Sequence, residues 1–194
     1  MQQPTRAALL SIAAFVATTA LAALKAGDAA PPFTAPASLA GQPFTYSLKE
    51  SLAKGPVVVY FYPSAYTSGC NVQAHEFSTK TEQFAAAGAS VVGVSLDSIE
   101  RLNAFSADPD YCAGKLAVAS DADGRIARSY GLRVSDKVRG ATDTRGKEID
   151  HGFTERTTFV VRKDGTIAAT VGGVSPTENV TRALEQVQKL ATTR

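Results

Sequence analysis

The sequence is poor in the residues that usually build metal and nucleic-acid sites. It has two cysteines, two histidines and one methionine, and no tryptophan, among 194 residues. His75 and His151 lie far apart, with no cysteine or carboxylate cluster around either, so we expect no metal and no cofactor. The formal charge is only +2 at pH 7. No stripe of basic and aromatic residues occurs, which argues against nucleic-acid binding.

Sequence repeats and low-complexity segments are also lacking. Hydrophobic residues make up 44% and charged residues 20% of the chain, as in ordinary globular proteins. At this length we expect one domain with a sizeable core.

The N-terminus has the pattern of an export signal. Arg6 precedes an apolar run over residues 7–24 that contains the small-residue triplet Ala20-Leu21-Ala22. The run barely reaches the ~20 residues of a membrane span. We therefore predict a cleaved signal peptide over residues 1–22 and a domain over 23–194, exported and periplasmic, without stable membrane association. An uncleaved anchor is the alternative. The first cysteine is Cys70, which excludes lipid attachment directly after the signal.

The most informative stretch is a strand followed by a turn and a cysteine. Residues 57–62 are β-branched or aromatic, which indicates a strand buried on both faces. Pro63 and Gly69 mark the following turn, and Cys70 begins a helical stretch. A helix N-terminus favours the nucleophilic thiolate, and we expect Thr67 to hydrogen-bond both the sulfur and an oxygen that it attacks. Alternatively, Cys70 is a buried small hydrophobe and Thr67 a helix cap.

Further elements alternate between strand and helix. This alternation predicts right-handed βαβ crossovers, a central sheet, and functional loops at the carboxyl ends of its strands. We expect an extended lead-in over residues 30–52 with a small hairpin near Gly41. The polar loop 135–152 carries a charge run that predicts a solvated surface. The other predicted elements are helices at 71–87, 98–106, 124–130 and 176–191, and strands at 90–96, 116–120, 157–162 and 166–171.

The motif Pro-x-x-x-Thr-x-x-Cys, formed by Pro63, Thr67 and Cys70 after an apolar strand, resembles the active-site signature of the peroxiredoxins (AhpC/TSA superfamily). Other segments resemble the family in the same order, so that the likeness covers roughly residues 25 to 190. It is closest to the PrxQ, or bacterioferritin comigratory protein, branch. The resemblance implies an α/β, thioredoxin-like fold, with a central mixed sheet flanked by helices and a peroxiredoxin N-terminal extension. The other matching segments are 25–33, 93–97, 119–121, 130–132 and 155–165.

The resemblance also implies a reaction and its residues. Cys70 is expected to be the peroxidatic cysteine of a thiol-dependent peroxidase acting on hydrogen peroxide and organic hydroperoxides. Cys112 is expected to resolve it through an intramolecular disulfide, and Arg156 to reach the nucleophile. Pro63 shapes and shields the pocket, and Thr67 orients the peroxide. A thioredoxin-like protein or a small thiol is the expected reductant, and a monomer the expected state.

The sequence departs from the branch at two places. The commoner PrxQ pattern has its resolving cysteine five residues after the nucleophile, where this chain has His75, and Ser68 stands where many members have proline. Two other readings stay open. One is a thiol–disulfide oxidoreductase, although such proteins usually present Cys-x-x-Cys and Thr67 occupies the first position. The other is a non-catalytic thioredoxin-fold binding module stapled by a structural Cys70–Cys112 disulfide.

Overall fold

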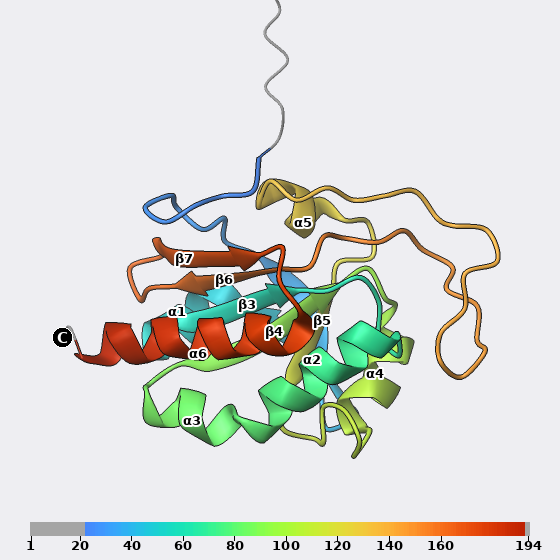
Figure 1. The fold of residues 1–194 in the computed structure, drawn as a ribbon, viewed down its shortest axis with the longest axis horizontal. Coiled ribbons are helices and arrows are strands. Elements are labelled where there is room, and N and C mark those ends of the chain that lie inside the picture. The colour runs from blue at the N-terminus through green and yellow to red at the C-terminus, as the bar shows by residue number, and fades with distance from the viewer. Residues whose placement is uncertain (1–21, 193–194) are drawn as a thin grey trace, which may run out of the picture.

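The fold is built on a seven-stranded mixed β-sheet, which the computed structural model describes over residues 22–192. The strand order is β2-β1-β5-β4-β3-β6-β7. β3, β4 and β5 are parallel, and antiparallel strands flank them on both sides (Figure 1). The elements are β1 (Thr34–Leu39), β2 (Gln42–Ser47), α1 (Leu48–Lys54), β3 (Val57–Phe61), α2 (Ser68–Thr79), α3 (Thr81–Ala86), β4 (Ser90–Ser95), α4 (Ile99–Ala107), β5 (Ala117–Ser120), α5 (Arg125–Ser129), β6 (Thr157–Val161), β7 (Ile167–Gly172) and α6 (Pro176–Thr192).

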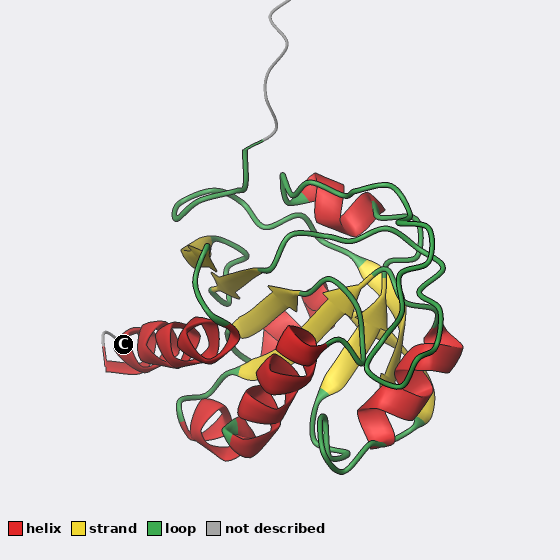
Figure 2. Cartoon of the chain, turned by 45° about the vertical axis from the view of Figure 1, so that its right-hand side comes forward, coloured by secondary structure: helices red, strands yellow, loops and turns green. Residues whose placement is uncertain are grey.

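Helices cover both faces of the sheet because its inner strand β3 is apolar on both (Figure 2). Val58 and Tyr60 belong to a core cluster shared with α2, α3, α4 and α6. Val57 and Phe61 belong to the opposite cluster, shared with α1 and α5. The predicted α/β fold with a central mixed sheet flanked by helices is therefore confirmed.

The lead-in that the sequence predicts as extended contains a helix. The hairpin expected near Gly41 is present as β1 and β2, but α1 follows it directly. Ser47 caps this helix by accepting a hydrogen bond from the Glu50 N–H at 3.3 Å. Leu48 and Leu52 are its buried residues. Seven residues are too few for a helical periodicity to stand out in the sequence.

The single helix predicted over residues 71–87 is divided. Lys80, with φ −104° and ψ 6°, separates α2 from α3. Around it, the hydroxyls of Ser78, Thr79 and Thr81 each donate to a carbonyl three residues earlier, at 2.9 to 3.1 Å. Such side-chain bonds compete with the regular helical pattern, so the helix breaks without glycine or proline.

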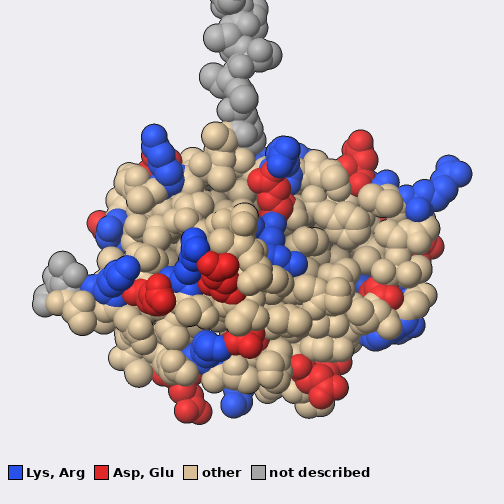
Figure 3. All heavy atoms as spheres, in the orientation of Figure 1, with Lys and Arg blue, Asp and Glu red and all other residues tan. Residues whose placement is uncertain are grey.

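The described chain is anchored from Leu24 onward. Leu24 N–H donates to the Tyr130 carbonyl at 3.1 Å, and its carbonyl accepts from Thr170 Oγ1 at 2.7 Å. The predicted signal peptide lies outside the described residues apart from Ala22. Within residues 22–192, no helix is long and apolar enough to cross a membrane. Basic and acidic side chains are interspersed over the face in Figure 3, in keeping with the small formal charge.

Candidate active site

Cys70 lies in the first turn of α2, just beyond the carboxyl end of the inner strand β3. The turn between them reverses the chain at Tyr66, whose φ of 64° is rare for a residue other than glycine. Thr67 occupies the N-cap position, and the Cys70 N–H donates to its carbonyl at 3.0 Å. The cysteine is only 1% exposed. Its place at a helix N-terminus, where backbone N–H groups lack helical partners, suits a thiolate.

Arg156, directly before β6, places a guanidinium against the sulfur. Its Nη2 donates to Cys70 Sγ at 3.4 Å, and its Nη1 donates to Gln73 Oε1. Gly69 makes room for this approach, since a Cβ at that position would lie 3.0 Å from Nη2. A cation bonded to the sulfur favours the ionised thiol. The structure therefore brings Arg156 to Cys70, as the resemblance implies.

A buried chain of side-chain amides holds this arginine. Gln73 Nε2 donates to Asn179 Oδ1 at 2.9 Å, and the same oxygen accepts from Thr158 Oγ1 at 2.6 Å. Asn179 in turn donates to the Val171 carbonyl at 3.0 Å. Gln73, Thr158 and Asn179 are all fully buried. With both ends of each amide bonded, Gln73 is fixed with its carbonyl oxygen toward Arg156.

Thr67 differs from the sequence expectation in one contact. Its hydroxyl donates to the Ser64 carbonyl at 2.8 Å. A hydroxyl has a single hydrogen, so the expected donation to the Cys70 sulfur does not occur in this state. The lone pairs of Oγ1 remain available to accept a hydrogen bond from a bound peroxide. Pro63 is half-buried between the end of β3 and Ser64, at the start of the turn.

Cys112 lies in a turn between α4 and β5, fully buried and unpaired, as Cys70 is. The two sulfurs are not within disulfide distance, so the structural-staple alternative does not describe this state. Both belong to one core cluster. The Tyr60 phenol lies close to both cysteines. Its pKa is raised by burial first, and then by the charges that Cys112 and Cys70 would carry. Burial and then the charge of Asp108 raise the pKa of the Cys112 thiol, which keeps it protonated here.

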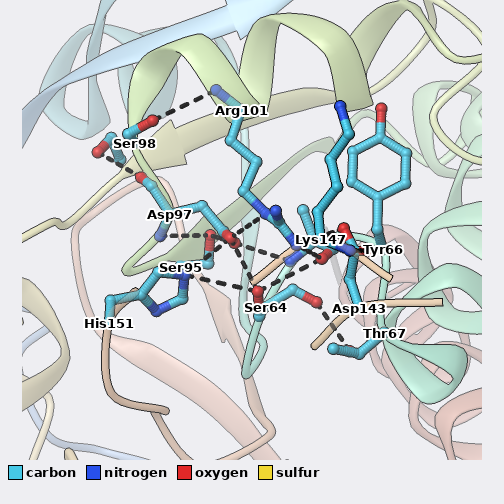
Figure 4. A network of polar contacts seen from close by, with 12 residues as sticks. Ser64, Tyr66, Thr67, Ser95, Asp97, Ser98, Arg101, Asp143, Lys147 and His151 are labelled. Carbon is cyan, nitrogen blue, oxygen red and sulfur yellow. Dashed lines mark hydrogen bonds and ion pairs between the residues drawn. The ribbon is translucent and has the colours of Figure 1, made fainter. Parts of the chain in front are cut away.

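A buried carboxylate fixes the turn that leads to Cys70 (Figure 4). Asp97 follows β4 and is fully buried. Its Oδ2 accepts from the Ala65 N–H and the Ser95 hydroxyl, both at 2.7 Å. Its Oδ1 accepts from the Ser64 hydroxyl at 2.8 Å. Asp97 therefore holds two successive residues of the turn.

Two cations share the same oxygen of Asp97. His151 Nε2 lies 2.9 Å from Oδ1, and Arg101 Nε forms an ion pair with it at 2.9 Å. Burial acts to raise the pKa of Asp97, but the hydrogen bond and charge of His151 outweigh it and lower that pKa. Burial acts to lower the pKa of His151, and the bond and charge of Asp97 outweigh it, so this pKa is raised. The site thus favours a carboxylate paired with an imidazolium.

The loop between α5 and β6, residues 133–155, reaches back to the same turn; we call it the excursion (gold to orange in Figure 1). The Tyr66 carbonyl accepts from the N–H and the hydroxyl of Thr144, at 3.0 and 2.8 Å. Arg145 stacks on the Tyr66 ring, with Cζ 3.1 Å from its centroid. Asp143 is buried and pairs with Arg101 and Arg145, each at 2.8 Å. The lysines and arginines of the predicted charge run are exposed, as predicted. The burial of Asp143 and the contacts of this loop with the Cys70 turn were not predicted.

The side chains that support the site, as opposed to those that react in it, were not predicted from the sequence. A polar residue directly after a buried strand was the available signal for Asp97, since such positions gather at one sheet edge. Gln73 and Asn179 gave no signal, because 106 residues separate them. Among residues 22–192, no three His, Cys, Asp or Glu side chains are grouped to hold a metal ion.

The mixed sheet, the helix that follows β3 and the cysteine at the start of that helix are the features of a thioredoxin-like fold. The model of the AhpC/TSA family matches residues 26–170. The chain therefore belongs to the AhpC/TSA family, the peroxiredoxins, and is a peroxidase of the oxidoreductase class.

Individual relatives agree with this assignment. Peroxiredoxin Bcp of Escherichia coli is 34% identical over 144 residues, covering 74% of this chain and 83% of its own. A putative peroxiredoxin of Mycobacterium tuberculosis is 33% identical over 159 residues, covering 82% and 92%. The crystal structure of peroxidoxin BcpB from M. tuberculosis is similar with a TM-score of 0.72 at 27% identity, over 86% of this chain and 98% of that one.

A further solved structure carries a description of its reaction. The bacterioferritin comigratory protein of Xanthomonas campestris, described for its alkyl peroxide reduction activity, is similar with a TM-score of 0.63 at 25% identity. The match covers 80% of this chain and 91% of that one. These relatives confirm the predicted likeness to the bacterioferritin comigratory branch.

Proposed function

We propose that this peroxidase reduces hydrogen peroxide and organic hydroperoxides with Cys70 as its peroxidatic residue and Cys112 as its resolving residue. The observation that carries the proposal is the contact of Arg156 Nη2 with Cys70 Sγ at the N-terminus of α2. A buried thiol that meets a cation and a helix start is built to react as the thiolate.

In the first step the Cys70 thiolate attacks the terminal oxygen of the peroxide. A sulfur–oxygen bond forms as the oxygen–oxygen bond breaks, the sulfur is oxidised to sulfenic acid, and the other oxygen leaves as water or an alcohol after taking a proton. Negative charge moves from sulfur to oxygen in this step. Arg156 and the free N–H groups of the first turn of α2 are placed to stabilise that charge, and Thr67 to orient the peroxide.

In the second step the Cys112 thiolate attacks the sulfenic sulfur of Cys70, and hydroxide leaves as water. This step needs a movement, because both sulfurs are buried and the pKa of Cys112 is raised. The Cys112 turn is the segment suited to move. It is short, and its residues Pro109, Asp110 and Lys115 are exposed. Movement into water would also ease ionisation of Cys112.

A thioredoxin-like protein or a small thiol then reduces the Cys70–Cys112 disulfide. Two electrons from the donor thiols restore both cysteines, and the donor leaves as its own disulfide. The enzyme acts as a monomer in this proposal, since every protein group that the cycle uses lies in one chain.

Replacing Cys112 by serine tests the resolving role. Wild-type protein given one equivalent of peroxide is expected to form an intramolecular disulfide, two mass units lighter than the dithiol. The Cys112→Ser variant is expected to hold a sulfenic acid on Cys70 that dimedone traps, and to form sulfinic acid with excess peroxide. Mass spectrometry of peptides distinguishes these products. A disulfide-free wild-type protein with the same products as the variant would contradict the role.

We also propose that residues 1–22 are a cleaved signal peptide and that the enzyme works in the periplasm with a donor located there. The apolar run after Arg6 and the Ala20-Leu21-Ala22 triplet support this. Expression of the full chain in a Gram-negative host, followed by fractionation and N-terminal sequencing, is expected to yield periplasmic protein beginning at Ala23. Protein that keeps Met1 in the cytosolic or membrane fraction would contradict export.

A further inference from the structure

We infer that His151 is a positioning residue for peroxide reduction, whose charge state sets the geometry of the Cys70 turn through Asp97 and Ser64. The inference rests on the proposed role of Cys70. It begins from the two ring nitrogens of His151, because both face groups that only accept hydrogen bonds. Nε2 lies 2.9 Å from Asp97 Oδ1, and Nδ1 lies 2.7 Å from the Gly152 carbonyl oxygen.

Only the doubly protonated ring satisfies both contacts. An imidazolium donates from both nitrogens, whereas a neutral imidazole has one donor and one lone pair. Loss of the proton would therefore set a lone pair against an oxygen at 2.7 or 2.9 Å. The charged groups around the ring agree with this, since Asp97 and Asp150 raise the pKa of His151 against the opposing effect of burial.

Arg101 is the other cation that reaches this carboxylate. It comes from α4, and its Nη2 donates to Asp143 on the excursion at 2.8 Å and to the Ala65 carbonyl of the turn at 2.9 Å. The guanidinium stays charged throughout the accessible pH range. His151 is thus the group at Asp97 whose charge changes near neutral pH.

Ser64 connects the charge state of His151 to the active site. The Ser64 hydroxyl donates to Asp97 at 2.8 Å and lies 3.5 Å from His151 Nε2. When Nε2 loses its proton, its lone pair becomes a further acceptor for the Ser64 hydroxyl. The hydroxyl then turns away from Asp97. The Ser64 carbonyl is also the acceptor for the Thr67 hydroxyl and N–H, and the Thr67 carbonyl binds the Cys70 N–H.

This arrangement gives two opposing effects of pH on Cys70 oxidation. Rising pH produces more thiolate and speeds the reaction, as for any thiol. Rising pH through the pKa of His151 releases the turn and slows it. The ion pair between His151 and Asp97 also contributes to folding stability, because the pKa of His151 is higher in the folded state than in the unfolded state. This contribution is complete below the unfolded-state pKa of about 6.5. It is lost as pH rises through the folded-state pKa.

The test compares rates of Cys70 oxidation between about pH 5.5 and pH 9.5, by quenching with dimedone and counting the dimedone adduct and the Cys70–Cys112 disulfide together by mass spectrometry. In wild-type protein two effects on the oxidation rate are expected as pH rises. Formation of the thiolate increases the rate, and loss of the His151 proton decreases it, which gives the profile a falling component. His151→Gln keeps one donor toward Asp97 but cannot titrate. It is expected to lose the falling component and, at the lowest pH, to react about tenfold more slowly, the effect of one bond to a charged group. His151→Ala, without a donor, is expected to be slower still.

His75→Gln is the matched control, since His75 is the other histidine of the sequence and lies on the surface of α2, where its Nδ1 meets the Asp110 carbonyl. Its profile is expected to coincide with that of wild-type protein. Titration of labelled histidines in the unaltered protein by NMR requires no variant, and His151 is expected to titrate above an ordinary histidine.

Two outcomes overturn the inference: a His151→Gln profile that matches wild type, or a His151 that titrates below an ordinary histidine. If peroxide left Cys70 of wild-type protein with neither a dimedone adduct nor a disulfide to Cys112, the proposed role of Cys70 would instead be refuted. The two failures are therefore distinguishable.

Discussion

Replacing Cys70 by serine is expected to abolish peroxide reduction, a loss of at least about 1,000-fold. The serine hydroxyl fits the space of the thiol, but it does not ionise near neutral pH and is a poor nucleophile toward peroxide oxygen. Arg156 and the helix N-terminus stabilise an anion, and they cannot supply one that the side chain does not form. Peroxide consumption with excess dithiothreitol measures the effect.

Cys112→Ser is the matched control for this variant, because both cysteines are buried and both substitutions remove a single sulfur. With dithiothreitol as an external resolving thiol, Cys112→Ser is expected to keep consuming peroxide. Near-wild-type consumption by Cys70→Ser would show that the reactive thiol is elsewhere, and would contradict the proposed mechanism. Circular dichroism of both variants excludes unfolding as the cause.

The local part of this architecture was predictable from the sequence, since it depends on neighbours along the chain. An uninterrupted run of β-branched and aromatic residues is typical of a strand buried on both faces, and β3 is that strand. The turn to Cys70 follows within a few residues, so its place at a helix start was visible. α1 and the break at Lys80 were not visible, because they depend on one cap and on three hydroxyl contacts.

The contacts that hold the active-site residues in place could not be predicted in the same way, because they join residues far apart in the sequence. Asp97 and His151 are 54 residues apart, and Gln73 and Asn179 are 106 apart. The topology of the sheet brings them together, and no periodicity records that. The excursion is the clearest example of contacts that could not be predicted from the sequence. A charge run on a long loop usually indicates a solvated surface, yet Asp143 is buried there because Arg101 and Arg145 both bind it.

Replacing Arg156 by methionine is expected to slow Cys70 oxidation by about 100-fold, the effect of removing one donor that stabilises charge in a transition state. Methionine keeps much of the aliphatic bulk and removes the donors to Cys70 and Gln73. Arg156→Lys keeps the charge, but a single ammonium lacks the planar fork that reaches both partners. We expect it to recover only part of the rate.

Arg162→Met serves as the control for both variants. Arg162 follows the other end of β6, where it binds the Ile167 carbonyl at 3.1 Å, and its loss is expected to leave the oxidation rate unchanged. Single-turnover rates with dimedone quenching, measured with Cys112→Ser present in every variant, report the first step apart from resolution by Cys112. If Cys70 were oxidised at the wild-type rate in Arg156→Met, the contact of Arg156 with the Cys70 sulfur would play no part in the reaction. Equal rates in the lysine variant and wild type would mean that charge alone suffices. A stepwise loss, with lysine between arginine and methionine, is the result that the fixed fork between Cys70 and Gln73 requires.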